Sequence, residues 1–123
     1  MSTAHVVSPV ILLVEDDPST ASAMRRILKR WGWDVTVAAT VGAAVDYLRG
    51  SAPPRCVMLD LMLPDGEGTT VLRLIRGQGI DTRVIVTTGS NDATRLGEVA
   101  ALKPEVFLAK PIDLNALYEG LGH

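Results

Sequence analysis

Short apolar runs alternate along the chain with segments whose apolar residues recur every three or four positions. The apolar runs predict five strands, at residues 10–14, 33–38, 56–59, 83–87 and 106–109. Most of these runs are continuous, which is typical of strands buried on both faces of a parallel sheet. Helical periodicity predicts five helices, at residues 18–31, 41–49, 67–76, 91–102 and 114–121. Five strand–helix units in a row predict an α/β fold with helices on both faces of a doubly wound parallel sheet.

Local residues support several of these helix ends. Asp17 is placed to cap the first helix, Pro18 suits its first turn, and Gly32 follows its end. Asp113 is placed to cap the last helix in the same way. Pro64-Asp65-Gly66 predicts a turn before the third helix. The fourth helix is expected to be weak, because Gly97 lies in its middle and its apolar stripe is thin.

Composition narrows the class of protein. A chain of 123 residues with 47% hydrophobic residues fits one domain, predicted at residues 10–122 after a disordered lead at residues 1–9. A net charge of −2 gives no reason to expect nucleic-acid binding, and no apolar stretch approaches the roughly 20 residues of a membrane span. Cys56 is the only cysteine and lies in an apolar strand, so we expect a core residue and a cytoplasmic location.

Polar residues follow the predicted strands. Glu15 and Asp16 follow the first, Asp60 the third, Thr88 the fourth and Lys110 the fifth. Because parallel strands end at the same edge of a sheet, we expect these side chains to meet there. Three clustered acids repel one another unless a cation is present, and oxygen ligands favour Mg²⁺. Singly, such residues can be helix caps or turns. Together they predict a site for a phosphoryl group carried on Asp60 as nucleophile.

These residues and their spacing resemble the receiver domain of response regulators in two-component signalling. Asp60 follows Asp16 by 44 residues, and Lys110 follows Thr88 by 22. The resemblance covers residues 10–121 and extends to five further positions: Pro64, Gly68, Gly89, Phe107 and Pro111. It implies a flavodoxin-like sheet of strand order 2-1-3-4-5.

The resemblance also implies a chemistry. Asp60 is expected to take a phosphoryl group, with Mg²⁺, from a phosphohistidine on a histidine kinase or a histidine phosphotransfer domain. Asp16 and Asp60 would bind the metal directly, Glu15 through water, and Met62 through its backbone carbonyl. The chain would thus catalyse its own phosphorylation and slow dephosphorylation, while acting mainly as a signalling module.

By the same resemblance, phosphorylation changes a surface. Thr88 is expected to move toward the phosphoryl group and Phe107 to turn inward, with Lys110 pairing the phosphoryl charge. The fourth helix, fifth strand and fifth helix would then bind an output domain, a target protein or a second copy. Met62 and Ser90 stand where fast members place an amide and an acid, and the apolar Met62 side chain is expected to cover the phosphoryl group. We therefore expect the phosphoryl group to decay slowly.

The sequence departs from the family pattern before the fifth strand. Lys103-Pro104 stands where most receivers carry Gly-Ala, so we expect a differently shaped end to the fourth helix. The paired acids typical of the winged-helix DNA-binding subclass are absent before Phe107, so the charge-paired dimer of that subclass is not expected.

Other classes of protein fit less well. A haloacid-dehalogenase-type phosphatase needs a second aspartate where Met62 stands, and a nucleotide binder needs glycines after the first strand. A pseudo-receiver that acts by protein contact without phosphorylation stays as the alternative. The output, the kinase and the oligomeric state are open, as is whether the domain stands alone or belongs to a larger regulator.

Overall fold

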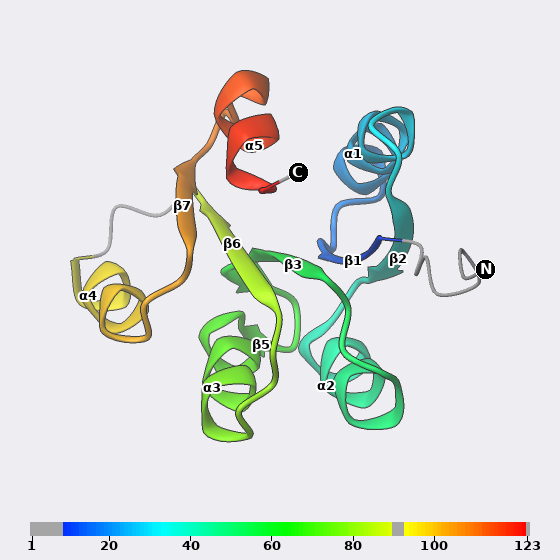
Figure 1. The fold of residues 1–123 in the computed structure, drawn as a ribbon. Coiled ribbons are helices and arrows are strands. Elements are labelled where there is room, and N and C mark those ends of the chain that lie inside the picture. The colour runs from blue at the N-terminus through cyan, green and yellow to red at the C-terminus, as the bar shows by residue number, and fades with distance from the viewer. Residues whose placement is uncertain (1–8, 90–92, 123) are drawn as a thin grey trace.

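The computed structural model describes residues 9–89 and 93–122, and a five-stranded parallel sheet lies at its centre (Figure 1). The strands are β1 (Val10–Val14), β2 (Asp34–Ala38), β3 (Cys56–Asp60), β6 (Arg83–Thr88) and β7 (Val106–Ala109). They lie in the order β2-β1-β3-β6-β7, which confirms the predicted flavodoxin-like order. Of the predicted lead only Pro9 is described, and its carbonyl accepts a hydrogen bond from the Asp34 amide at 2.9 Å.

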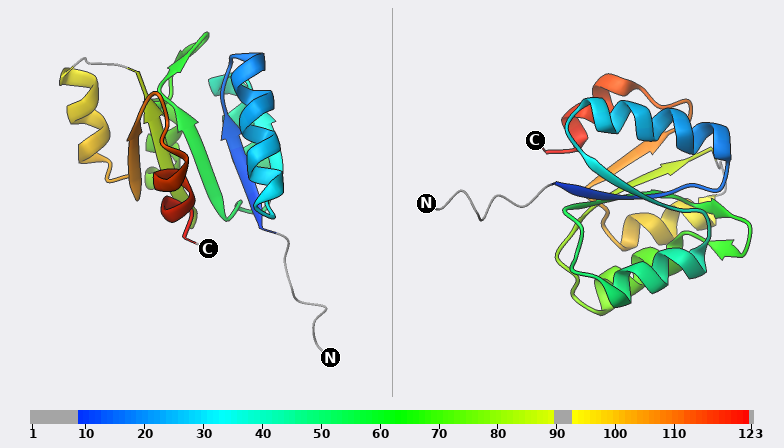
Figure 2. Two further views of the ribbon diagram at one scale, coloured as in Figure 1. Left: turned by 90° about the horizontal axis from the view of Figure 1, so that it is seen from above. Right: turned by 90° about the vertical axis from the view of Figure 1, so that its right-hand side faces the viewer.

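Helices cover both faces of the sheet (Figure 2). One face carries α1 (Pro18–Arg30) and α5 (Leu114–Gly120), and the other carries α2 (Val41–Gly50), α3 (Thr69–Gly77) and α4 (Ala93–Ala101). The five predicted helices are therefore present. None of the helices in the described part of the chain is long and apolar enough to cross a membrane.

Two apolar layers, one on each face, explain the continuous apolar strands. In β1, Leu12 and Val14 pack with α2, α3 and α4, whereas Ile11 and Leu13 pack with α1 and α5. All four side chains are at most 2% exposed, and burial of each contributes about 1.5–3 kcal/mol. Cys56 belongs to the second layer, where burial raises the pKa of its thiol to about 12. It is the core residue that the sequence predicts.

The predicted aspartate caps are confirmed. The Asp17 carboxylate accepts a hydrogen bond from the Thr20 amide at 3.0 Å and begins α1. The Asp113 carboxylate accepts from the amides of Asn115, at 2.8 Å, and Ala116, at 3.3 Å, and begins α5. Each cap satisfies amides that have no partner within the helix.

A hairpin lies between β3 and α3, where the sequence predicts a turn at residues 64–66 and a helix from residue 67. β4 (Met62–Leu63) pairs antiparallel with β5 (Gly66–Glu67). Helix α3 therefore begins at Thr69, and the prediction of a helix from residue 67 is wrong for its first two residues. Pairing of Glu67 with Met62 across the hairpin holds this backbone extended.

The end of α4 forms a left-handed turn without glycine. Lys103 itself takes the left-handed conformation, with φ of 51°, which glycine usually supplies after a helix. Arg76 of α3 donates to the carbonyl oxygens of Leu102, at 3.0 Å, and Lys103, at 2.8 Å. It also pairs with the Glu105 carboxylate at 2.8 Å. These contacts hold the turn. The sequence predicts a departure from the usual glycine pattern at this end of α4, but neither the left-handed conformation of Lys103 nor its contacts with Arg76.

Candidate functional site

Three carboxylates meet at the carboxyl edge of the sheet. Glu15 and Asp16 follow β1 and Asp60 ends β3, and these strands are neighbours in register. One carboxylate oxygen of each residue lies within 4.8 Å of the others. Glu15 and Asp60 are buried, whereas Asp16 is exposed. The structure thus brings together the three acids that the sequence selects.

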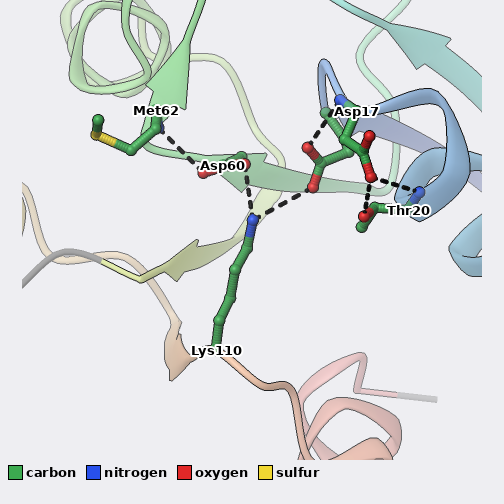
Figure 3. A network of polar contacts seen from close by, with 6 residues as sticks. Asp17, Thr20, Asp60, Met62 and Lys110 are labelled. Atoms are coloured by element: carbon green, nitrogen blue, oxygen red, sulfur yellow. Dashed lines mark hydrogen bonds and ion pairs between the residues drawn. The ribbon is translucent and has the colours of Figure 1, made fainter.

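Lys110 faces this acidic pocket from the end of β7. Its ammonium nitrogen lies 2.9 Å from Oδ2 of Asp60 and 3.4 Å from Oε1 of Glu15 (Figure 3). The Lys110–Pro111 peptide bond is cis. One cation therefore contacts two buried carboxylates, and the pocket keeps a net negative charge.

Burial and charge shift the pKa values in the pocket. Burial raises the pKa of Glu15, and the negative charge of Asp60 raises it further, against the Asp17 amide and the Lys110 charge, which lower it. Burial by itself would lower the pKa of Lys110, but its hydrogen bond and charge contact with Asp60, together with Glu15, raise it. Lys110 is therefore charged at neutral pH, while the acids repel each other.

Two donors orient the Asp60 carboxylate. Oδ1 accepts a hydrogen bond from the Met62 amide at 3.0 Å, and Oδ2 contacts Lys110 (Figure 3). Close packing fixes the backbone beneath, because a Cβ at Gly68 would lie 2.3 Å from the Asp60 carbonyl oxygen. The Gly68 amide donates to the Leu61 carbonyl at 2.9 Å. The side chain and the backbone of Asp60 are both held in place.

The oxygen atoms that the pocket offers as ligands suit a small divalent cation. Glu15, Asp16 and Asp60 all offer carboxylate oxygens, which Mg²⁺ prefers. The raised pKa of Glu15 reflects burial and repulsion by a neighbouring acid, and a bound cation would relieve that repulsion. The chemistry of the residues therefore fits Mg²⁺.

The residues expected to act as a switch lie on β6 and β7. Thr88 is the last residue of β6 and is 3% exposed. Its carbonyl accepts a hydrogen bond from the Lys110 amide at 2.9 Å. Phe107 lies on β7, in register with Val86 of β6, and is 38% exposed. Thr88 thus sits beside the pocket, and the Phe107 ring is accessible.

Met62 and Ser90 are the two residues expected to control phosphoryl lifetime, and the structure contradicts one expectation about Met62. The Met62 side chain is 52% exposed and points away from the Asp60 carboxylate (Figure 3). An apolar cover over Asp60 is therefore not seen here. Ser90 lies outside the described residues.

Asp65 is a residue of this region that sequence reasoning assigns only to a turn. Its carboxylate accepts hydrogen bonds from the amides of Val41, at 2.8 Å, and Gly42, at 3.0 Å, at the start of α2. These partners lie 24 and 23 residues away in sequence. No local pattern around Asp65 could have revealed them.

Comparison with known proteins identifies the family of this chain. The family model of the response regulator receiver domain matches residues 11–121. The chain belongs to this family, whose members receive the signal in two-component systems. A receiver protein from Pseudomonas putida superimposes with a TM-score of 0.86 at 28% identity, covering 95% of this chain and 98% of that one.

Two further proteins are similar to this chain over most of its length. A CheY-like receiver from Methanospirillum hungatei has a TM-score of 0.85 at 24% identity, covering 94% of this chain and 95% of that one, and shows the shared fold. The acid tolerance regulatory protein ActR of Rhizobium meliloti is 32% identical over 111 residues, which are 90% of this chain. The chain spans only 57% of ActR.

Proposed function

We propose that this receiver accepts a phosphoryl group on Asp60 from the phosphohistidine of a histidine kinase or of a histidine phosphotransfer domain. The observation that carries the proposal is the Asp60 carboxylate, held between Lys110 and the Met62 amide beside two further acids. An Asp60 oxygen forms a bond to phosphorus while the bond from phosphorus to the imidazole nitrogen breaks. The electron pair of that bond stays with the imidazole.

Four residues would hold Mg²⁺ in this proposal. Asp16 and Asp60 would bind it directly, Glu15 through water, and Met62 through the backbone carbonyl. When bound, the cation would neutralise charge on the phosphoryl oxygens. The clustering of the three carboxylates supports this assignment.

Lys110 and Thr88 act on the transferred group. The Lys110 ammonium leaves Oδ2 of Asp60 for a phosphoryl oxygen, and the Thr88 hydroxyl donates to another. Phe107 then turns into the space that Thr88 vacates. The surface formed by α4, β7 and α5 changes as a result and binds an output domain, a target protein or a second copy. The backbone contact between Thr88 and Lys110 supports a coupled movement.

The domain is assigned to residues 10–122, and its output to further sequence or to a separate target. The chain spans little more than half of ActR, whose printed name is that of a regulatory protein. This supports a role in which the receiver controls an output that is not part of the five-stranded unit.

Phosphorylation with a small-molecule donor tests the proposal. Incubation with acetyl phosphate and Mg²⁺ should add one phosphoryl group to the intact protein, measured by mass spectrometry. Asp60→Asn should abolish the addition, and so should removal of Mg²⁺ by a chelator. Equal labelling of that variant would place the phosphoryl group elsewhere. No labelling of the parent by acetyl phosphate or by phosphohistidine donors would favour the pseudo-receiver.

A further inference from the structure

The β4–β5 hairpin carries the peptide group that contacts Asp60, although its own pairing is short. Each strand has two residues, and a two-stranded hairpin is only marginally stable in water. Met62 and Glu67 are exposed, and Leu63 packs only partly buried against the core. The Met62 amide nevertheless lies 3.0 Å from Oδ1 of Asp60. A contact with a packed element would therefore help to hold the hairpin.

Asp65, at the turn of the hairpin, makes such a contact with α2. Its two oxygens accept from the amides of Val41 and Gly42, the first two residues of α2. These amides have no partner within the helix. The Thr40 hydroxyl caps only the next amide, that of Ala43, at 3.0 Å. The Gly42 and Val41 amides also lower the pKa of Asp65, so the carboxylate is charged at neutral pH.

Helix α2, whose first amides bind Asp65, is itself packed into the core. Ala44 and Leu48 are 0% and 6% exposed and lie in the apolar layer with α3 and α4. The hairpin projects beyond the carboxyl ends of the strands, on the face of the sheet that α2 and α3 cover (Figure 2). A carboxylate at its tip can therefore join it to a packed helix.

We propose that Asp65 is a positioning residue for the phosphoacceptor site. By binding the first amides of α2 it holds the hairpin, and with it the Met62 peptide group, beside Asp60. The inference rests on the proposed function, in which the Met62 carbonyl is a metal ligand. Loss of Asp65 loosens the hairpin, so the affinity for Mg²⁺ falls. Transfer at saturating Mg²⁺ changes little, because Asp60 and Lys110 are untouched.

Amide hydrogen exchange in the metal-free protein tests whether Asp65 holds the hairpin in place. Asp65→Ala should speed exchange of the Met62 amide together with those of Val41 and Gly42. Thr40→Ala is the matched control, because it removes a cap from the same end of α2 without touching the hairpin. It should speed exchange at Ala43 and leave Met62 unchanged. Faster exchange of Met62 in both variants, or in neither, overturns the proposal.

Titration with Mg²⁺ tests the consequence for the site. Asp65→Ala should raise the dissociation constant for Mg²⁺ roughly tenfold, as losses in the support of metal ligands do. Asp65→Asn, which keeps one acceptor oxygen, should give an intermediate value, and Thr40→Ala should match the parent. With acetyl phosphate, the Mg²⁺ concentration for half-maximal rate should rise while the maximal rate stays.

The two proposals fail differently. An unchanged dissociation constant in Asp65→Ala overturns the positioning role, even where the parent is phosphorylated normally. A parent that binds no Mg²⁺ contradicts the proposed function, while the exchange of the Met62 amide still decides whether Asp65 holds the hairpin. If Asp65→Ala does not fold, amide exchange and Mg²⁺ titration are both measured on Asp65→Asn.

Discussion

The ammonium of Lys110 lies 2.9 Å from Oδ2 of Asp60, although their strands are not neighbours. β6 separates β3 from β7 in the sheet, so the lysine side chain reaches across one strand. This contact places a fixed positive charge at the carboxylate proposed to receive the phosphoryl group. A charge held there before transfer needs no rearrangement of solvent during it.

Replacing Lys110 should slow phosphorylation strongly. Lys110→Ala removes the cation that faces the acids, so negative charge on the phosphoryl group is no longer balanced. We expect the rate of labelling by acetyl phosphate to fall roughly 10²–10³-fold, the usual cost of losing one such donor. Lys29→Ala, which removes an exposed lysine of α1, should keep the parental rate. A Lys110→Ala protein labelled at that rate would contradict the role given to this lysine.

Gly68 should tolerate no side chain. A Cβ there would lie 2.3 Å from the Asp60 carbonyl oxygen and 2.9 Å from the Leu61 Cα. Gly68→Ala should lower the free energy of unfolding by roughly 1–3 kcal/mol, as overpacking does, and should slow phosphorylation by displacing Asp60. Gly77→Ala, at the other end of α3 and with nothing within 4 Å, is the control and should not destabilise. Urea unfolding measures the stability of both variants. Equal stability would refute the close approach of Gly68 to the Asp60 carbonyl.

Glycine at position 103 should stabilise the protein. Lys103 adopts a left-handed φ of 51°, which costs a non-glycine residue about 1 kcal/mol or more. Part of the gain is lost because glycine makes the unfolded chain more flexible. We therefore expect Lys103→Gly to raise the free energy of unfolding by about 0.5 kcal/mol. Lys103→Ala, which keeps the strain, should show no gain. A lower stability of Lys103→Gly would mean that the side chain itself stabilises the turn.

The phosphoryl group on Asp60 should decay slowly. Neither the Met62 nor the Ser90 side chain carries an amide or an acid that could orient the attacking water, an effect worth ~10²-fold or more. The exposed Met62 side chain points away from Asp60, so this missing polar group, and not an apolar cover, carries the prediction (Figure 3). Met62→Asn with Ser90→Glu should speed loss of phosphate at constant Mg²⁺. Met62→Leu should leave decay unchanged, and a double variant as slow as the parent refutes the account.

Much of the candidate site could be predicted because strand ends are visible in the sequence. Glu15 and Asp60 follow apolar runs directly, and parallel pairing brings such residues to one edge. The same logic separates Asp17, which begins α1 as a cap, from the acidic pair before it. What these residues contact follows from strand order, which the family resemblance already implies.

The sequence by itself determined the strands, helices and caps, since each depends on residues within a few positions of one another. Tertiary structure alone decided the hairpin after β3, the bond from Asp65 to α2 and the left-handed turn at Lys103, which Arg76 of α3 holds. The contacts of Asp65 and Arg76 join groups more than twenty residues apart, whereas the hairpin pairs Met62 with Glu67 where helical periodicity predicts a helix from residue 67. Such contacts depend on how packed elements meet in space, and no periodicity along the chain records that.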